Sequence, residues 1–297
     1  MSGLNQTLLN QVRQFRERHA VPETAKSRVA QPPIPYFGDE ILEMAVTALL
    51  KGENILLTGG KATGKNILAE NLAWMFGRPV YNISFHVNTD SSSLIGTDTF
   101  VDNQVKLRRG PIYQCAMYGG FGILDEINMA KNEAVSVLHA VLDYRRMLDI
   151  PGYEKVPLAE ETRFIGTMNY GYAGTRELNE ALVSRFLVID MPEPEEDTLA
   201  QIFLHLFPNI RTGALKQFIG LFLDLQAKAA HGEITTRTLD LRGMVGALRT
   251  VEMGLSPKKA VTMGVTNKTF DLFEKEIVGD VVRTRIPDGW GREDVFE

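Results

Sequence analysis

The spacing of apolar residues divides the chain into an alternating part and a helical part. Between residues 54 and 190, short unbroken apolar runs alternate with stretches that have the 3.6-residue spacing of helices. The predicted strands cover 54–59, 80–85, 121–126, 163–169 and 186–190, and the predicted helices between them cover 65–76, 135–143 and about 177–186. Unbroken apolar strands are typically buried on both faces, so the alternation predicts a parallel sheet covered by helices.

The pattern changes after Pro192. No further run of strand quality follows, and apolar residues recur at helical spacing near 202–207, 218–225 and 239–248. We therefore predict a helical second domain with its tail over 193–297. The last residues, PDGWGREDVFE, are rich in glycine and acid, and we expect them to be loosely held.

The N-terminal segment differs from both parts. Its apolar residues at helical spacing are Leu4, Leu8, Val12 and Phe15, which predict a short amphipathic helix. Residues 21–36 contain four prolines and few apolar residues, which predicts an extended linker. We place this helical arm and Pro-rich linker over 1–33, and the α/β domain over 34–192.

Composition and charge narrow the class of protein. Of the 297 residues, 44% are hydrophobic and 23% are charged, as in a globular protein with a sizeable core. The net charge of −5 argues against a protein that coats nucleic acid, because that binding depends on Lys and Arg. Since no signal-peptide pattern or membrane-length apolar run is found, we expect a cytoplasmic protein without a membrane span. A single cysteine and five scattered histidines argue against a disulfide or structural zinc.

A glycine-rich loop directly follows the first predicted strand and opens a helix. It has the pattern G-x-x-x-x-G-K and reads Gly59, Gly60, Lys61, Ala62, Thr63, Gly64, Lys65, Asn66. In such a loop the backbone N–H groups surround phosphate oxygens, the helix dipole favours the anion, and the lysine reaches the terminal phosphates. The string alone is weak evidence, but its place between a strand and a helix favours a phosphate-binding loop.

Two adjacent carboxylates, Asp125 and Glu126, end the predicted strand at 121–126. In nucleotide sites of this kind the aspartate holds Mg²⁺, usually through water, and the glutamate activates the attacking water. The alternative is a solvated strand end. Together with the loop, the pair predicts a site for ATP and Mg²⁺.

The position after Lys65 departs from the usual pattern. A Ser or Thr there would offer a hydroxyl to Mg²⁺, but this chain has Asn66. An amide oxygen can also bind a hard cation, although from a longer side chain. We therefore expect Asn66 and Asp125 to ligate Mg²⁺, and the effect of Asn66 on hydrolysis stays open.

From about Pro35 to Arg237, the order and spacing of these motifs resemble the AAA+ ATPases and, within them, the MoxR-like group. The run RFIGTMN at 163–169 resembles the family's fourth core strand, whose sensor 1 asparagine, here Asn169, positions the hydrolytic water. The run GTRELNEALVSRF at 174–186 is similar to the MoxR-like run that ends in an Arg-Phe pair. The resemblance implies that Arg185 is an arginine finger supplied to a neighbouring subunit's nucleotide.

A third run, ITTRTLDLR at 234–242, resembles the sensor 2 segment of the family's lid domain. The resemblance implies that Arg237 is its arginine, and Arg242 and Arg249 are the alternatives for that role.

Two insertions also resemble those of the MoxR-like group. Residues 97–109 and 145–161 each consist of two short alternating runs about a turn, which predicts two β-hairpins. The second turn is centred on Pro151 and Gly152. In the family, such hairpins often line a central pore or meet the substrate.

The resemblance implies an α/β P-loop NTPase core with a C-terminal helical lid, and ATP hydrolysis in a homo-oligomeric, hexameric ring. Glu126, Asn169 and Arg185 would be the catalytic residues. The work would be remodelling or maturation of a client protein, which in this group often carries a von Willebrand factor A domain.

Two other functions stay open. The first is an assembly protein that ATP locks in a ring with little hydrolysis, for which Asn66 is the support. The second is a DNA-directed motor subunit, against which the acidic pI and the lack of a DNA-binding motif weigh.

Overall fold

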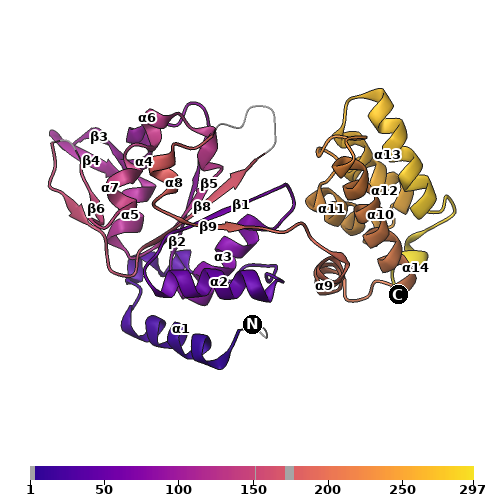
Figure 1. Cartoon of the computed structure of the whole chain (residues 1–297), viewed down its shortest axis with the longest axis horizontal. Helices are drawn as coiled ribbons and strands as arrows, with labels where there is room; N and C mark the ends of the chain where they lie inside the picture. Colours follow the sequence, from indigo (N-terminus) through magenta and orange to yellow (C-terminus); the bar gives the residue numbers. More distant parts are fainter. Residues whose placement is uncertain (1–3, 151, 171–176) are drawn as a thin grey trace. The chain divides into compact units, whose positions relative to one another are not determined.

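The computed structural model describes residues 4–150, 152–170 and 177–297. These residues form two compact units (Figure 1). The first, an α/β unit, ends at Pro192, and the second, a helical unit, is built on Glu193–Glu297. Within the described residues, no helix is both long enough and apolar enough to cross a membrane.

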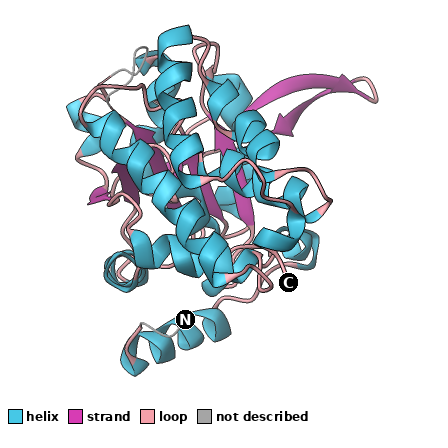
Figure 2. Cartoon of the chain, turned by 90° about the vertical axis from the view of Figure 1, so that its right-hand side faces the viewer, coloured by secondary structure: helices cyan, strands magenta, loops and turns pink. Residues whose placement is uncertain are grey.

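The first unit contains a five-stranded parallel sheet with the order β2-β5-β8-β1-β9. Its strands are β1 (Ile55–Gly59), β2 (Val80–Ser84), β5 (Phe121–Asp125), β8 (Arg163–Asn169) and β9 (Leu187–Asp190). The parallel sheet expected from the alternating pattern is therefore confirmed. Figure 2 shows these strands in magenta.

Helices cover both faces of this sheet, as the unbroken apolar strands require. In β1, Ile55 and Leu57 pack in one core cluster and Leu56 packs in the other, because successive side chains point to opposite faces. One cluster joins the sheet to α1 (Gln6–Arg18), α2 (Asp39–Leu50) and α3 (Lys65–Met75). The other joins it to α4 (Ser91–Ile95), α5 (Pro111–Met117), α6 (Asn132–Val135) and α7 (Leu138–Leu142).

Two helices are shorter than their patterns predicted. The helix expected over 135–143 is divided between α6 and α7, and the Ser136 hydroxyl at the break donates to the Glu133 carbonyl oxygen at 2.7 Å. Such a local bond competes with continued helix. The helix expected near 177–186 is α8 (Glu180–Val183), since Asn179 caps it by accepting the Ala181 N–H at 2.8 Å.

The N-terminal helix packs on the first unit, with Leu4, Leu8, Val12 and Phe15 buried. The linker after it is less extended than predicted, because residues 23–28 form a 3-10 helix, η1 (Glu23–Arg28). Ala25 is buried there, and its N–H donates to the Pro22 carbonyl oxygen at 2.9 Å. Burial of this apolar residue offsets the tendency of the prolines to extend the chain.

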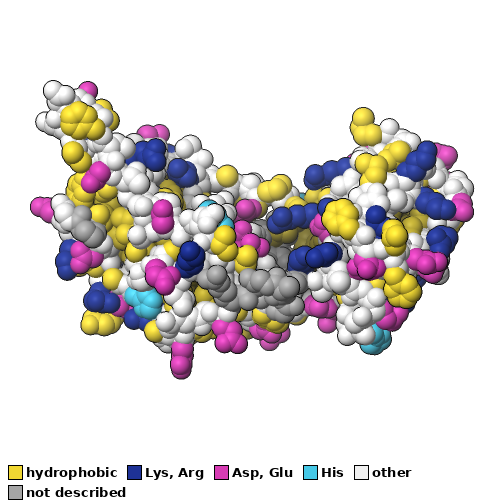
Figure 3. Space-filling view, turned by 90° about the horizontal axis from the view of Figure 1, so that it is seen from above, with side chains coloured by type: hydrophobic (Ala, Val, Ile, Leu, Met, Phe, Trp, Pro, Cys, Tyr) yellow, Lys and Arg dark blue, Asp and Glu magenta, His cyan; other side chains and the backbone are white. Residues whose placement is uncertain are grey.

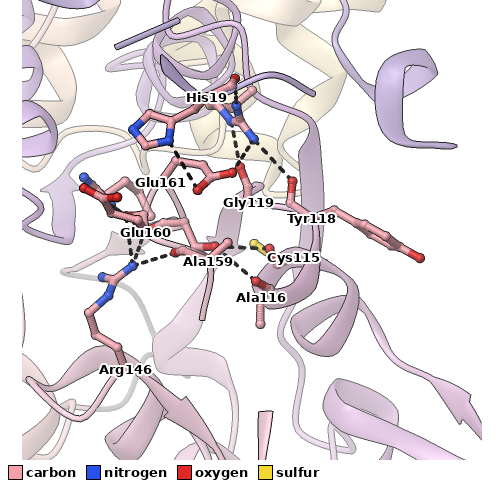
Figure 4. Close-up of polar contacts among 12 residues, drawn as sticks. His19, Cys115, Ala116, Tyr118, Gly119, Arg146, Ala159, Glu160 and Glu161 are labelled. Atoms are coloured by element: carbon pink, nitrogen blue, oxygen red, sulfur yellow. Dashed lines mark hydrogen bonds and ion pairs between the residues drawn. The ribbon is translucent and has the colours of Figure 1, made fainter. Parts of the chain in front are cut away.

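The end of α1 is held by the fully buried guanidinium of Arg78. Figure 4 shows His19, Gly119 and Glu161, which lie near one another there. Arg78 donates to the carbonyl oxygens of His19 at 2.6 Å and Gly119 at 2.7 Å, and it pairs with Glu161 at 3.2 Å. Burial lowers the pKa of Arg78, and Glu161 opposes that shift. A nearby guanidinium, Arg146, binds the carbonyl oxygens that lead into β8, those of Ala159, Glu160 and Thr162.

Both predicted insertions are antiparallel hairpins. The first pairs β3 (Gly96–Val101) with β4 (Gln104–Arg109). Its turn residues Asp102 and Asn103 have φ of 52° and 59°, as a tight type I′ hairpin turn requires. The second pairs β6 (Met147–Leu148) with β7 (Val156–Pro157). The predicted centre of its turn was Pro151 and Gly152, and Pro151 lies outside the described residues.

The second unit is helical throughout its regular structure. It comprises α9 (Glu196–Leu206), α10 (Thr212–Ala230), α11 (Leu241–Glu252), α12 (Pro257–Gly264), η3 (Thr266–Lys268), α13 (Leu272–Arg285) and α14 (Arg292–Val295). These helices share one apolar core. Where α11 and α12 meet, a Cβ on Gly243 would lie 2.0 Å from the Gly264 carbonyl oxygen, so only glycine permits this close approach.

The C-terminal tail does not behave as predicted. We expected it to be loosely held, but Val295 and Phe296 are buried. The Val295 carbonyl oxygen accepts the Arg211 N–H at 2.8 Å, and the Phe296 ring packs against Phe207. Two apolar residues near the end of the tail suffice to dock it, whatever its glycine content.

Candidate nucleotide site

The glycine-rich loop leaves the end of β1 and enters α3. Gly59, Ala62 and Gly64 all have positive φ, at 143°, 61° and 83°. Glycine adopts such conformations freely, which allows the loop to curl. Gly64 caps the N-terminus of α3, where the backbone N–H groups and the helix dipole favour an anion.

Lys65 is the first residue of α3, and its side chain folds back into the loop. Its Nζ donates to the carbonyl oxygens of Gly59 at 3.1 Å and Gly60 at 2.6 Å, and the residue is only 7% exposed. Burial lowers the pKa of Lys65 to about 8, and the carboxylates of Asp125, Asp190 and Glu126 oppose this shift. A desolvated ammonium at this position is suited to an anionic ligand.

Two predicted carboxylates lie at the end of β5, between β2 and β8 in the sheet. Asp125 is its last residue, and Glu126 has a left-handed φ of 53°, which is uncommon for a residue other than glycine. One buried hydroxyl links them: Thr167 donates to Asp125 Oδ1 at 2.7 Å and accepts the Glu126 N–H at 3.1 Å. Sequence analysis missed Thr167, although it stands two residues before the predicted Asn169.

The structure brings Glu126 and Asn169 together. Asn169 Nδ2 donates to Glu126 Oε1 at 3.3 Å. Asn128, buried after β5, donates in turn to the Asn169 carbonyl oxygen at 2.9 Å. These contacts join the ends of two neighbouring strands, β5 and β8, and Asn128 is a second residue that sequence analysis missed.

A further carboxylate, Asp190, ends the edge strand β9. It accepts hydrogen bonds from the Thr58 hydroxyl at 3.0 Å and the Tyr170 hydroxyl at 3.1 Å. Like the run FGILD at 121–125, the run FLVID at 186–190 is an apolar strand that ends on an aspartate. This similarity could have identified Asp190 from the sequence. The ends of β1, β5, β8 and β9 thus carry polar groups at the edge where parallel α/β sheets bind ligands.

Asn66 follows Lys65 on the first turn of α3 and is half-buried. Among the described residues, no group of three or more His, Cys, Asp or Glu side chains could hold a metal by itself. Mg²⁺ normally keeps several waters and is bound by one or two protein groups plus substrate phosphates. A carboxylate and an amide oxygen suit this mode of binding, and the assignment of Mg²⁺ to Asp125 and Asn66 stays a prediction.

The described contacts of Arg185 are to residues other than the site residues named above. It follows α8, and its Nε donates to the His139 carbonyl oxygen at 3.2 Å. Its Nη1 donates to the Ala181 carbonyl oxygen, and its Nη2 lies 3.9 Å from an Asp143 carboxylate oxygen. The side chain is thus held against α7 and α8 of its own chain.

Arg237 belongs to the second unit, where it is exposed in the turn before α11. This turn is anchored by the buried Glu274, whose carboxylate accepts the N–H and hydroxyl of Thr235 at 2.6 Å and 2.7 Å. Arg242 and Arg249 are also exposed, on α11. Figure 3 shows several Lys and Arg side chains on the visible face of this unit. Because more than one exposed arginine is available, the assignment of Arg237 as the sensor 2 arginine stays a prediction.

Comparison with known proteins adds four findings. A model of the AAA domain of the dynein-related subfamily matches residues 54–186. YojN, an uncharacterized protein of Bacillus subtilis, is 32% identical over 252 residues, or 83% of this chain and 82% of YojN. SSP1341, an uncharacterized protein of Staphylococcus saprophyticus, is 29% identical over 250 residues, or 82% of this chain and 95% of that protein. A solved structure of a proposed ATPase from Cytophaga hutchinsonii has a TM-score of 0.50 and 16% identity, covering 95% of this chain and 90% of the other.

The matched range begins at the strand before the glycine-rich loop and ends at Phe186. It therefore contains the loop, the two carboxylates of β5 and the end of β8. The solved structure supports the α/β fold with a helical C-terminal part.

Proposed function

Because the chain belongs to the AAA+ ATPases, we propose that it hydrolyses ATP in an oligomeric ring and uses the energy to remodel or mature a client protein, as MoxR-like proteins do. The observation that carries the ATPase proposal is the arrangement of Lys65, Glu126 and Asn169. The buried ammonium lies near the Glu126 carboxylate, and Asn169 holds that carboxylate at 3.3 Å.

Each of these residues has a distinct task. Lys65 would leave its two carbonyl partners and donate to the terminal phosphates of ATP, which stabilises the charge that develops there. Glu126 would accept a proton from the attacking water, and Asn169 would fix its carboxylate and orient that water. Mg²⁺, held by Asp125 and Asn66, would neutralise phosphate charge when bound.

The ring proposal concerns Arg185. Within one chain this arginine is bound to the carbonyl oxygens of His139 and Ala181. In a head-to-tail ring, Arg185 of one subunit could reach the phosphates of the ATP bound to the next subunit, since heterologous contacts close into rings. We take a hexamer as the ring size, on the resemblance to the MoxR-like group.

The client proposal draws on the β3–β4 hairpin. Its outer half exposes Phe100, Val101 and Val105. A contiguous exposed apolar patch is typical of a protein-binding surface, and Phe100 and Val105 are paired across this hairpin. A client with a von Willebrand factor A domain is the form that the resemblance suggests.

Phosphate release from purified protein tests the proposed function. We expect steady hydrolysis that Glu126→Gln abolishes while ATP binding persists, and Lys65→Ala should weaken ATP binding about tenfold or more. Glu133→Gln, at an exposed carboxylate on α6, is the matched control and should be without effect. Glu126→Gln protein should also retain its client on co-purification. If it hydrolyses ATP at the wild-type rate, Glu126 is not the base.

A second candidate is the nucleotide-locked assembly protein, and Asn66 is the observation that favours it. The usual Ser or Thr at position 66 would offer a hydroxyl to Mg²⁺. If the lack of that hydroxyl limits catalysis, Asn66→Thr should raise the rate of phosphate release by supplying this ligand. If the rate falls instead, the amide oxygen is already the adapted ligand and the locked-ring function loses its support.

A further inference from the structure

A groove runs along the outer side of α2, beside the edge strand β9. Its apolar lining includes Met44 and Leu187, which are 47% and 49% exposed. Leu187 and Ile189 face the α2 side of the sheet, but only Ile189 is covered. A large apolar side chain is therefore left in solvent at the sheet edge, next to an exposed helix stripe.

The backbone of β9 also has unused pairing groups at this edge. The Leu187 N–H donates to the Asn54 carbonyl oxygen at 2.9 Å and the Met191 N–H to that of Thr58 at 2.8 Å, both on the β1 side. Because alternate residues of a strand bond to opposite sides, the N–H and C=O of Val188 point outward. Among the described residues, β9 pairs with β1 alone (Figure 1).

The rim of the groove is acidic. Glu40, Glu43 and Glu53 line it together with a single cation, Lys51. Within the described part of the chain, these four side chains make no ion pairs; Glu43 accepts a 3.4 Å hydrogen bond from the Asn5 amide. Carboxylates around an apolar floor favour a ligand that has both apolar and cationic side chains.

We propose that the outer edge of β9 and the groove beside α2 bind an extended basic segment of a partner protein, which adds to the sheet as a sixth strand. Its backbone would pair with that of Val188, its apolar side chains would cover Leu187 and Met44, and its Lys or Arg side chains would meet the three glutamates. A second copy of this chain fits less well, because antiparallel pairing of two β9 strands would bring the acidic rims together. Nucleic acid is disfavoured by the same carboxylates.

Fluorescence anisotropy of the full-length chain with a labelled peptide of alternating valine and lysine tests this proposal. We expect saturable binding that weakens with salt, and no binding of the peptide of alternating valine and glutamate. The combined variant Glu40→Gln, Glu43→Gln and Glu53→Gln should weaken binding about tenfold, the scale of several exposed ion pairs together. Its matched control, Glu133→Gln, Glu252→Gln and Glu276→Gln, changes the net charge equally at exposed sites elsewhere and should bind normally.

A backbone variant tests strand addition separately. Val188→Pro removes the outward N–H and leaves the N–H groups that pair with β1, so it should abolish binding, whereas Val188→Thr should not. Unchanged phosphate release in these variants shows that the site is separate from hydrolysis. The proposal is overturned if no peptide binds, if both peptides bind alike, or if the glutamine variant binds as well as its control. If the chain dimerises and Val188→Pro prevents this dimerisation, the proposal is also overturned, because the occupant of the edge is then a second copy of this chain.

Discussion

At the scale of single residues, the candidate site depends on short polar contacts between neighbouring strand ends. Thr167 is the clearest case, because its one hydroxyl contacts both Asp125 and Glu126. We predict that Thr167→Val lowers the rate constant of hydrolysis about tenfold, because the carboxylates lose their alignment, while ATP affinity changes little. Stopped-flow phosphate release and calorimetry measure the two quantities.

The control for that prediction is Thr162→Val. Thr162 is also buried, and its hydroxyl donates only to the carbonyl oxygens of Cys115 and Ala116 at 3.4 Å. Both variants should lose about 1–3 kcal/mol of the free energy of unfolding, but only Thr167→Val should lose rate. Equal rates in the two variants would show that Thr167 is merely structural.

The pH dependence of ATP binding is a second prediction at this scale. Burial lowers the pKa of Lys65 to about 8, so below that pH the ammonium is charged and above it the folded protein loses this proton. ATP affinity should therefore decline as pH rises through about 8, well below the ordinary lysine value of about 10.4. Calorimetry between neutral and alkaline pH measures this decline. In Lys65→Arg the guanidinium stays charged, so a decline of the same size there would exclude Lys65 as its source.

At the scale of elements, close packing of helices depends on where glycine stands. A Cβ at position 243 of α11 would approach the Gly264 carbonyl oxygen to 2.0 Å, so Gly243→Ala must push α11 and α12 apart. We predict a loss of about 1–3 kcal/mol in the stability of the second unit. Gly246→Ala, on the same helix with nothing within 4 Å, should instead gain about 0.5–1 kcal/mol. Urea unfolding of the two variants checks both signs, and equal effects would contradict the close-approach argument.

At the scale of the whole molecule, the proposed ring requires that two subunits share a site. We predict that Arg185→Ala binds ATP but hydrolyses it about a thousandfold more slowly, the scale on which arginine fingers act. The Glu126→Gln protein lacks the catalytic carboxylate but keeps Arg185. When the two variants are mixed, part of the activity should return, because some interfaces then pair an intact Glu126 with an intact Arg185. If no mixture recovers activity although subunits exchange, Arg185 acts within its own chain or holds α7 and α8 in place.

The sequence by itself determined those features that depend on neighbours along the chain. The glycine-rich loop, the unbroken strands and the turn within residues 97–109 are all local, because backbone conformation there follows from a few adjacent residues. The parallel sheet followed too, since strands separated by helices leave few arrangements.

Only the tertiary structure decided which distant side chains meet. Thr167 contacts Asp125 and Glu126 because β5 and β8 pair in parallel register, and Asn128 reaches Asn169 for the same reason. Pattern alone does not specify register between strands that lie some 40 residues apart. Docking of the tail was likewise decided in three dimensions, because burial of Val295 and Phe296 depends on a surface that residues far earlier in the chain provide.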